Sequence, residues 1–136
     1  NYTNIAKFRS CYNTPPAYSI YISGLVFKWI KNNGALENME KQNRLKSNWL
    51  YSYIDSTEFY SNSVHHASRS RTNIPFRLYR KALHEPFIRG AKEARLIQLE
   101  GHRSIGGIRA SLYNALPLSG VSALIEYMKD FEYRYG

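Results

Sequence analysis

Residues 101–114 read Gly-His-Arg-Ser-Ile-Gly-Gly-Ile-Arg-Ala-Ser-Leu-Tyr-Asn and combine a histidine and two arginines with a Gly-Gly pair. Arginine holds carboxylate and phosphate groups through two parallel hydrogen bonds, and paired glycines permit a sharp turn or the close approach of a ligand. The end of the segment, Ile108 to Tyr113, has the pattern of a β-strand. We therefore expect an anion-binding loop on a rigid strand, with His102, Arg103 and Arg109 as candidate binding residues. A structural salt-bridge role for these side chains is the alternative.

The residues that flank this segment predict helices and one short strand. Upstream, we expect a helix from Ala82 to about Arg95, with Pro86 in its first turn. A short strand from Leu96 to Leu99 and a loop from Gly101 to Gly107 should follow. Downstream, Pro117 opens a last helix, whose apolar side chains recur at helical spacing; they are Val121, Leu124, Ile125, Met128 and Phe131.

The first half of the chain predicts two longer helices. Helical spacing runs from Pro15 to about Asn32, and Asn33-Gly34 is a stop signal. A second helix is expected from about Ala35 to Asp55. Lysine and glutamate side chains should fill one side of it, opposite a face that holds Leu36, Met39, Asn43, Leu50 and Ile54.

The remaining segments complete the fold prediction. Residues 1–12 show no clear period and read as a strand remnant or a loop, and residues 56–68 are polar and loop-like. Ser70 to Leu78 alternates like a strand, and Pro75 within it favours an edge position or a bulge. The sum is an α+β fold, with helices packed on a small, mostly antiparallel sheet.

Composition limits the class of protein. The chain has 136 residues with 43% hydrophobic content, which suffices for one domain with a core. Its net charge of +9 is scattered over the sequence, so most charges should lie on a solvated surface. No apolar run is long enough to span a bilayer. The single cysteine, Cys11, excludes an internal disulfide and fits a reducing compartment. Because the chain starts at Asn1 without a methionine, we expect either processing or a piece of a longer polypeptide.

Two further motifs have both a functional and a plain interpretation. Asn13-Thr14-Pro15-Pro16 precedes a helix, and a helix start can bind phosphate, although a capping motif explains the same residues. His65-His66 has no cysteine or acidic partner at ligand spacing, which favours a solvated loop over a metal site. No nucleophile and base with a third orienting group can be recognised in the chain.

A group of arginines suggests a different class of function. Phe76 and Tyr79 could stack on bases beside a basic ridge for nucleic acid, formed by Arg69, Arg71, Arg77 and Arg80. A half-exposed strand produces the same alternation of charged and apolar residues without any nucleic acid.

Four ordered segments resemble the C-terminal part of the phosphoserine aminotransferase family of pyridoxal-phosphate enzymes. They are Tyr12-Asn-Thr-Pro-Pro16, Ser23-Gly-Leu-Val-Phe-Lys-Trp29, Arg69-Ser-Arg-Thr-Asn-Ile-Pro-Phe76 and the stretch from Gly101 to Leu118, which is followed by Gly120-Val121. The resemblance runs from about Tyr12 to Gly136. It implies the C-terminal small domain of the fold type I pyridoxal-phosphate-dependent transferase fold.

The resemblance also implies an activity. Members of the family transfer an amino group between L-glutamate and 3-phosphohydroxypyruvate and give O-phospho-L-serine for serine biosynthesis. In bacteria they also serve pyridoxine biosynthesis. They are cytoplasmic homodimers with active sites at the subunit interface, and their partners are small anionic substrates rather than nucleic acid or membranes. Pyridoxal 5'-phosphate is the implied cofactor of the full-length enzyme.

Residue roles follow from the matched motifs. By the resemblance, Arg109 holds the substrate α-carboxylate, and His102 and Arg103 help to hold the substrate phosphate or the distal carboxylate of glutamate. Asn13 and Thr14 reach across the dimer to the cofactor phosphate of the neighbouring subunit. No metal ligand is implied.

The catalytic lysine that binds the cofactor has no matching motif in this sequence. We therefore expect residues 1–136 to be inactive alone, with residues 1–16 as the end of the large domain and residues 17–136 as the small domain. A missing N-terminal large domain would supply the lysine. The alternatives are another class-V aminotransferase with a different anionic substrate, or the basic nucleic-acid-binding module described above.

Overall fold

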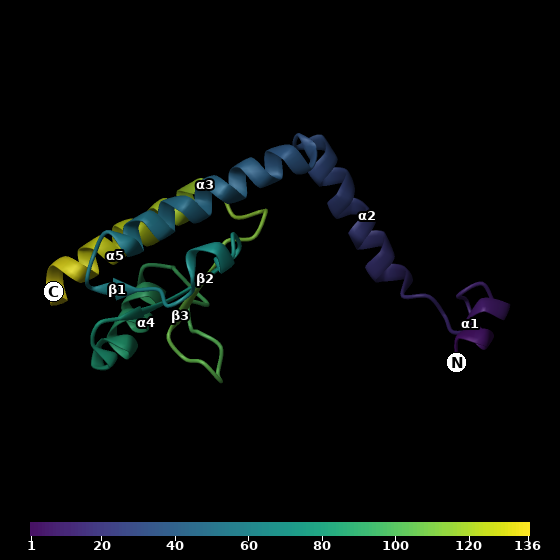
Figure 1. The fold of residues 1–136 in the computed structure, drawn as a ribbon. Coiled ribbons are helices and arrows are strands. Elements are labelled where there is room, and N and C mark those ends of the chain that lie inside the picture. The colour runs from purple at the N-terminus through teal and green to yellow at the C-terminus, as the bar shows by residue number, and fades with distance from the viewer. The chain divides into compact units, whose positions relative to one another are not determined.

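The computed structural model describes all of residues 1–136, which divide into two compact units, residues 1–38 and residues 39–136. The elements of both units can be followed by label and colour in Figure 1. This division reflects contacts within the present chain. The predicted boundary between a large and a small domain, after Pro16, stays a prediction.

The first unit contains α1 (Tyr2–Lys7) and α2 (Ala17–Asn32). The loop or strand remnant expected at the start of the chain is wrong for residues 2–7, because the Asn1 side chain accepts a hydrogen bond from the Thr3 backbone N–H (3.0 Å) and caps a short helix there. Helix α2 starts two residues later than predicted and ends as predicted before Gly34, which has a φ of 83°. Neither helix has a buried residue.

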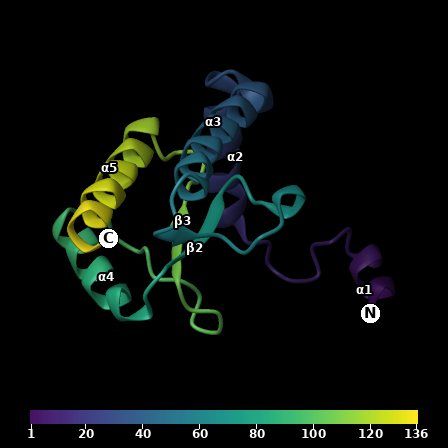
Figure 2. The same cartoon turned by 60° about the vertical axis from the view of Figure 1, so that its left-hand side comes forward.

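The second unit has its own core and begins within α3 (Ala35–Asp55), whose predicted bounds are confirmed. Its other long helix, α5 (Leu118–Tyr135), begins after Pro117 as predicted. Figures 1 and 2 show α4 (His84–Glu93) beside α5 on one side of the sheet. The remaining elements are the strands β1 (Tyr60–Ser61), β2 (Asn73–Leu78) and β3 (Ile108–Ser111) and the short 3-10 helices η1 (His66–Ser68) and η2 (Lys81–Leu83).

The three strands form an antiparallel sheet in the order β1-β2-β3. Side chains alternate along each strand, so one face of β2 and β3 is buried and carries Ile74, Phe76, Ile108 and Ala110. The other face carries Asn73, Pro75 and Arg109. The predicted α+β class is confirmed, and Arg109 lies on the sheet face that the core does not use.

Pro75 occupies the central strand, but at a position where β2 has no neighbouring strand on one side. β1 pairs only with Arg77 and Leu78 of β2. Pro75 is opposite Arg109 of β3, whose backbone N–H donates to Leu99 O (2.8 Å) instead. The Pro75 carbonyl accepts a hydrogen bond from the Asn62 side chain. Proline therefore removes no ladder hydrogen bond, and the predicted edge character is confirmed locally.

The core confirms the predicted apolar stripe of α5 and corrects the predicted faces of α3. All five stripe residues of α5 are buried. In α3, Met39, Leu50 and Ile54 are buried as predicted, but Leu36 is 75% exposed. Lys46 departs from the prediction that most charges lie on a solvated surface, because it is 2% exposed. Its ammonium donates to the carbonyls of Tyr113 (2.8 Å) and Leu116 (3.1 Å) and so fixes α3 to the segment before α5.

The strand predicted from Leu96 to Leu99 is wrong. Arg95 and Gln98 have φ values of 63° and 60°, and two left-handed residues this close interrupt an extended strand. Only Glu100 forms an isolated bridge, to Ile108.

No helix in the structure is both long and apolar enough to cross a membrane.

Candidate functional site

The segment from Gly101 to Gly107 forms a closed loop directly before β3, as predicted. The Gly101 N–H donates to Gly107 O (2.9 Å) and closes its neck. Within the loop, His102 O accepts from the N–H groups of Ile105 (2.9 Å) and Gly106 (2.7 Å). Gly106 and Gly107 have φ values of 70° and 74°, a region that favours glycine. The Gly-Gly pair therefore makes the turn that brings the loop back to the sheet.

Arg109 is the second residue of β3 and its side chain is half-buried. Its Nε is buried and has no hydrogen-bond partner within the chain. Arg109 and His102 border the same hollow of about 400 Å³, which Tyr51, Ser70 and Asn73 also line. A buried donor without a partner is costly, and a guanidinium that borders a hollow is suited to bind a carboxylate. The geometry thus favours anion binding over a structural salt bridge for Arg109, which has no acidic partner.

His102 and Arg103 are both exposed on the loop. The His102 Nδ1 accepts from the Ser104 N–H (3.3 Å) and lies 2.7 Å from the Ser104 hydroxyl, so the ring is held by its own loop. In the neutral tautomer that fits these contacts, Nε2 carries the proton and is free to donate. Arg103 makes no hydrogen bond or ion pair and does not line the hollow that His102 and Arg109 share. The structure therefore brings two of the three predicted residues together.

Asn13 and Thr14 lie in the first unit, in the irregular segment before α2. A capping role for them is wrong, because Pro16 is the N-cap residue and no side chain bonds to the first turn of α2. Both side chains are exposed and form no hydrogen bond. Their predicted role toward a cofactor phosphate stays a prediction.

The arginines near β2 do not form a free basic ridge. Arg69 donates two hydrogen bonds to Asp55 (2.5 and 2.8 Å) and stacks on Tyr51, and its hydrogen bonds lower the pKa of the Asp55 carboxyl. Arg71 pairs with Glu40 at 2.7 Å. Phe76, which was to stack on bases, is 2% exposed. These contacts remove most of the support for a nucleic-acid surface.

The hollow also has polar residues that are not among the predicted site residues. Tyr51 comes from α3, and Ser70 and Asn73 come from the segment that enters β2. Tyr51 donates its hydroxyl to Ser70 O (3.0 Å), which joins α3 to that segment. Burial raises the pKa of the Tyr51 hydroxyl, so it remains a neutral donor. No local pattern marks these residues, although Arg69 to Phe76 is one of the four matched segments.

A family model described as aminotransferase class-V matches residues 1–124. The chain belongs to the class-V aminotransferase family. Two similar relatives are the phosphoserine aminotransferases of Bordetella parapertussis, 54% identical over 136 residues, and of Burkholderia cenocepacia, 57% identical over 130 residues. These alignments cover 100% and 96% of this class-V chain and 36% of each relative.

Solved structures agree with this membership. The phosphoserine aminotransferase from Bacillus circulans subsp. alkalophilus matches with a TM-score of 0.92 and 41% identity, over 99% of this chain and 38% of that one. A phosphoserine aminotransferase from Trichomonas vaginalis, solved with bound pyridoxal phosphate, matches with a TM-score of 0.85 and 36% identity, over 94% of this chain and 37% of that one. The predicted family and fold type are confirmed, and this class-V aminotransferase chain spans little more than a third of its relatives' length.

Proposed function

We propose that this chain is the C-terminal part of a phosphoserine aminotransferase. The complete enzyme, a polypeptide of the relatives' length, would transfer an amino group between L-glutamate and 3-phosphohydroxypyruvate. The observation that carries the proposal is the unpartnered Nε of Arg109 at a hollow shared with His102. The names of the relatives support the same reaction.

Each anionic group of the substrate is assigned a binding residue. Arg109 would bind the α-carboxylate, which both substrates possess, and its fixed fork would orient the neighbouring α-carbon. The exposed His102 and Arg103 would bind the phosphate of one substrate or the distal carboxylate of the other. The net charge of +9 favours the approach of such anions.

The segment before α2 fits one part of a site for pyridoxal phosphate. Asn13 and Thr14 offer unpaired polar side chains, and the uncapped first turn of α2 offers backbone N–H groups at the positive end of the helix dipole. Together these groups suit the cofactor phosphate. Pyridoxal phosphate, when bound, supplies an electron sink for charge that develops at the α-carbon. None of the lysines in residues 1–136 matches the motif of the family's catalytic lysine, so residues outside this chain would supply it.

The cellular setting follows from the same proposal. The complete enzyme would be a cytoplasmic homodimer with active sites at the interface, in which Asn13 and Thr14 serve the partner's cofactor. It would act in serine biosynthesis and, in a bacterium, in pyridoxine biosynthesis. Residues 1–136 alone would be inactive.

The deciding experiment is a substrate comparison with the complete enzyme. We expect transfer from L-glutamate to 3-phosphohydroxypyruvate, and Arg103→Ala should lower kcat/KM for this oxo acid by roughly tenfold to a hundredfold, because a charge-assisted contact to phosphate contributes about 1.5–3 kcal/mol. An unphosphorylated oxo acid should be affected far less. Equal losses for both oxo acids would refute the role of Arg103. Preference of the wild type for an unphosphorylated oxo acid would instead favour another class-V aminotransferase.

A further inference from the structure

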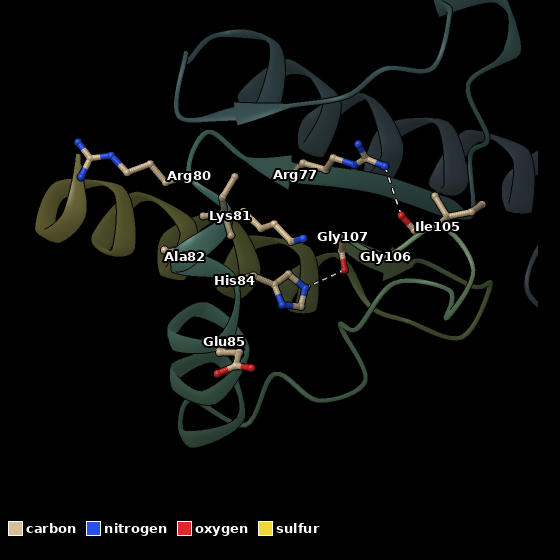
Figure 3. A pocket seen from close by; sticks show the side chains of 10 residues that line it. Arg77, Arg80, Lys81, Ala82, His84, Glu85, Ile105, Gly106 and Gly107 are labelled. Carbon is tan, nitrogen blue, oxygen red and sulfur yellow. Dashed lines mark hydrogen bonds between the residues drawn. The ribbon is translucent and has the colours of Figure 1, made fainter.

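Two side chains that the proposed function does not use contact the backbone of the Gly101–Gly107 loop. His84, the first residue of α4, has its Nε2 3.0 Å from Gly107 O. Arg77 of β2 donates from Nη2 to Ile105 O over 3.3 Å. Figure 3 shows both side chains pointing to the loop from these two elements. Because a carbonyl only accepts, the His84 ring carries a proton on Nε2 in this contact.

The His84 contact falls on the carbonyl that closes the loop. Gly107 O already accepts the neck hydrogen bond from the Gly101 N–H (2.9 Å), and His84 occupies its second lone pair. The loop also lies directly on β2, since a Cβ added at Gly107 would come within 3.1 Å of Phe76 O and 3.2 Å of the Arg77 Cγ. The loop is therefore held at its neck and against the sheet.

The two contacts border a different hollow from the candidate substrate site. Arg77 and His84 border a hollow of about 860 Å³, whereas His102 and Arg109 border the hollow of about 400 Å³. Ile105 and Gly106 border both hollows, so the loop backbone connects the two contacts with the candidate substrate site. His84 and Arg77 border only the larger hollow, so their effect on a bound substrate would pass through this backbone.

We propose that His84 and Arg77 are positioning residues that hold the loop in the conformation in which His102 and Arg103 receive the substrate phosphate. This inference rests on the proposed function. Without the contacts from His84 and Arg77, the loop would be mobile in the free enzyme and would lose conformational freedom when substrate binds. That entropy cost would weaken substrate binding. Because the cost is the same for the bound ground state and the transition state, it appears in KM and not in kcat.

A general electrostatic effect is the competing explanation, since the Arg77 guanidinium adds positive charge near the site. Arg80 provides the matched control. It borders the same hollow as Arg77, but its guanidinium stacks on Tyr79 at 4.8 Å from the ring centre and forms no hydrogen bond to the loop. Arg80→Met and Arg77→Met remove the same charge, and only the second removes a loop contact.

The kinetic test uses the complete enzyme with cofactor. His84→Ala should raise KM for the phosphorylated oxo acid by about 3- to 10-fold with kcat nearly unchanged, as the loss of one hydrogen bond predicts. His84→Gln keeps an N–H donor and should restore most of the affinity. His66→Ala, at an exposed histidine without side-chain hydrogen bonds, is the control and should change nothing. An unchanged KM in His84→Ala, or no rescue by glutamine, would overturn the proposal.

The arginine pair is tested in the same assay. Arg77→Met should raise KM for the phosphorylated oxo acid, whereas Arg80→Met should leave it unchanged at physiological ionic strength. Equal rises in both variants would assign the effect to charge and overturn the role of Arg77. Because Arg77 is exposed, this variant also provides the test if His84→Ala fails to fold.

Hydrogen exchange separates this inference from the proposed function. Without substrate, the backbone N–H groups of residues 101–107 should exchange faster in His84→Ala than in the wild type, because the neck opens more often. Unchanged exchange would overturn the role of His84, whatever the activity. Faster exchange in an enzyme that shows no aminotransferase activity would refute the proposed function and leave loop positioning in place.

Discussion

Arg109 is the residue whose chemistry depends most on exact hydrogen-bond geometry. It lies on a strand, and its half-buried side chain borders the hollow. Lysine carries the same charge but cannot donate two parallel hydrogen bonds to a carboxylate. The charge and the fork can therefore be tested separately by substitution.

We expect Arg109→Lys to lower kcat/KM in both half-reactions of the complete enzyme by roughly tenfold to a hundredfold, which corresponds to about 1.5–3 kcal/mol. Both halves are affected because both substrates carry an α-carboxylate. Steady-state kinetics with each substrate pair would measure the effect. Arg89→Lys, an exposed arginine of α4 without an ion pair, is the matched control. Unchanged efficiency would remove Arg109 from the site.

Helix α4 contains Gly90, although glycine has a low helical propensity. Glycine inside a helix is less favourable than alanine by roughly 0.5–1 kcal/mol. At Gly90, however, a Cβ would lie 2.8 Å from the Tyr127 hydroxyl of α5. That hydroxyl donates to Phe87 O (2.7 Å), and its ring packs against Phe87 and Phe131. The glycine therefore allows α4 and α5 to approach.

Gly90→Ala should destabilise the protein by about 1–3 kcal/mol, because the rigid Tyr127 ring cannot move away without loss of packing and of its hydrogen bond. A lower Tm of the complete enzyme would measure this. In a Tyr127→Phe background the clash is gone, so the same Gly90→Ala change should raise Tm. A stabilising Gly90→Ala in the wild type would show that propensity outweighs this contact.

On the scale of the whole molecule, three tyrosines of the second unit retain their protons in the folded state. Burial is the main cause that raises the pKa values of Tyr53, Tyr60 and Tyr127 above 10.0. The pKa of Tyr127 reaches about 12. Tyr60 donates to Met128 O (2.8 Å) and Tyr53 donates to Glu132 (2.7 Å), which a phenolate could not do. The unfolded chain ionises near pH 10, so the folded state binds more protons above that value.

The stability of the protein should therefore be fully present below pH 10 and should fall as the pH rises above 10 toward the raised pKa values. Lys46 has the opposite sign, because burial lowers its pKa, but it is one group against four, since the pKa of Tyr51 is raised too. Urea midpoints between pH 8 and 11 would measure the slope. Tyr60→Phe should lower stability at pH 8 and flatten the decline, whereas Tyr133→Phe, at a 90% exposed tyrosine, should not flatten it. An equal slope in both variants would contradict this account.

Much of the fold follows from local patterns. The bounds of α3, the C-terminal end of α2, the start of α5 after Pro117 and the loop between Gly101 and Gly107 all agree with sequence signals. These signals are proline and glycine positions and 3.6-residue spacing, which act over a few residues. The four matched segments are equally local, and they were sufficient to predict the family and fold type.

The features that local patterns miss depend on partners that are distant in sequence. Lys46 is buried by carbonyls 67 and 70 residues away, and Arg69 is paired with a carboxylate 14 residues away on α3. Tyr51 reaches the hollow of Arg109 only because α3 packs beside the sheet. Periodicity describes which face a side chain takes, but burial, ion pairing and the walls of a cavity arise when separate elements meet. The sequence alone thus indicated which residue types form the candidate site, whereas the shape of the site and the contacts that support it arise from tertiary packing.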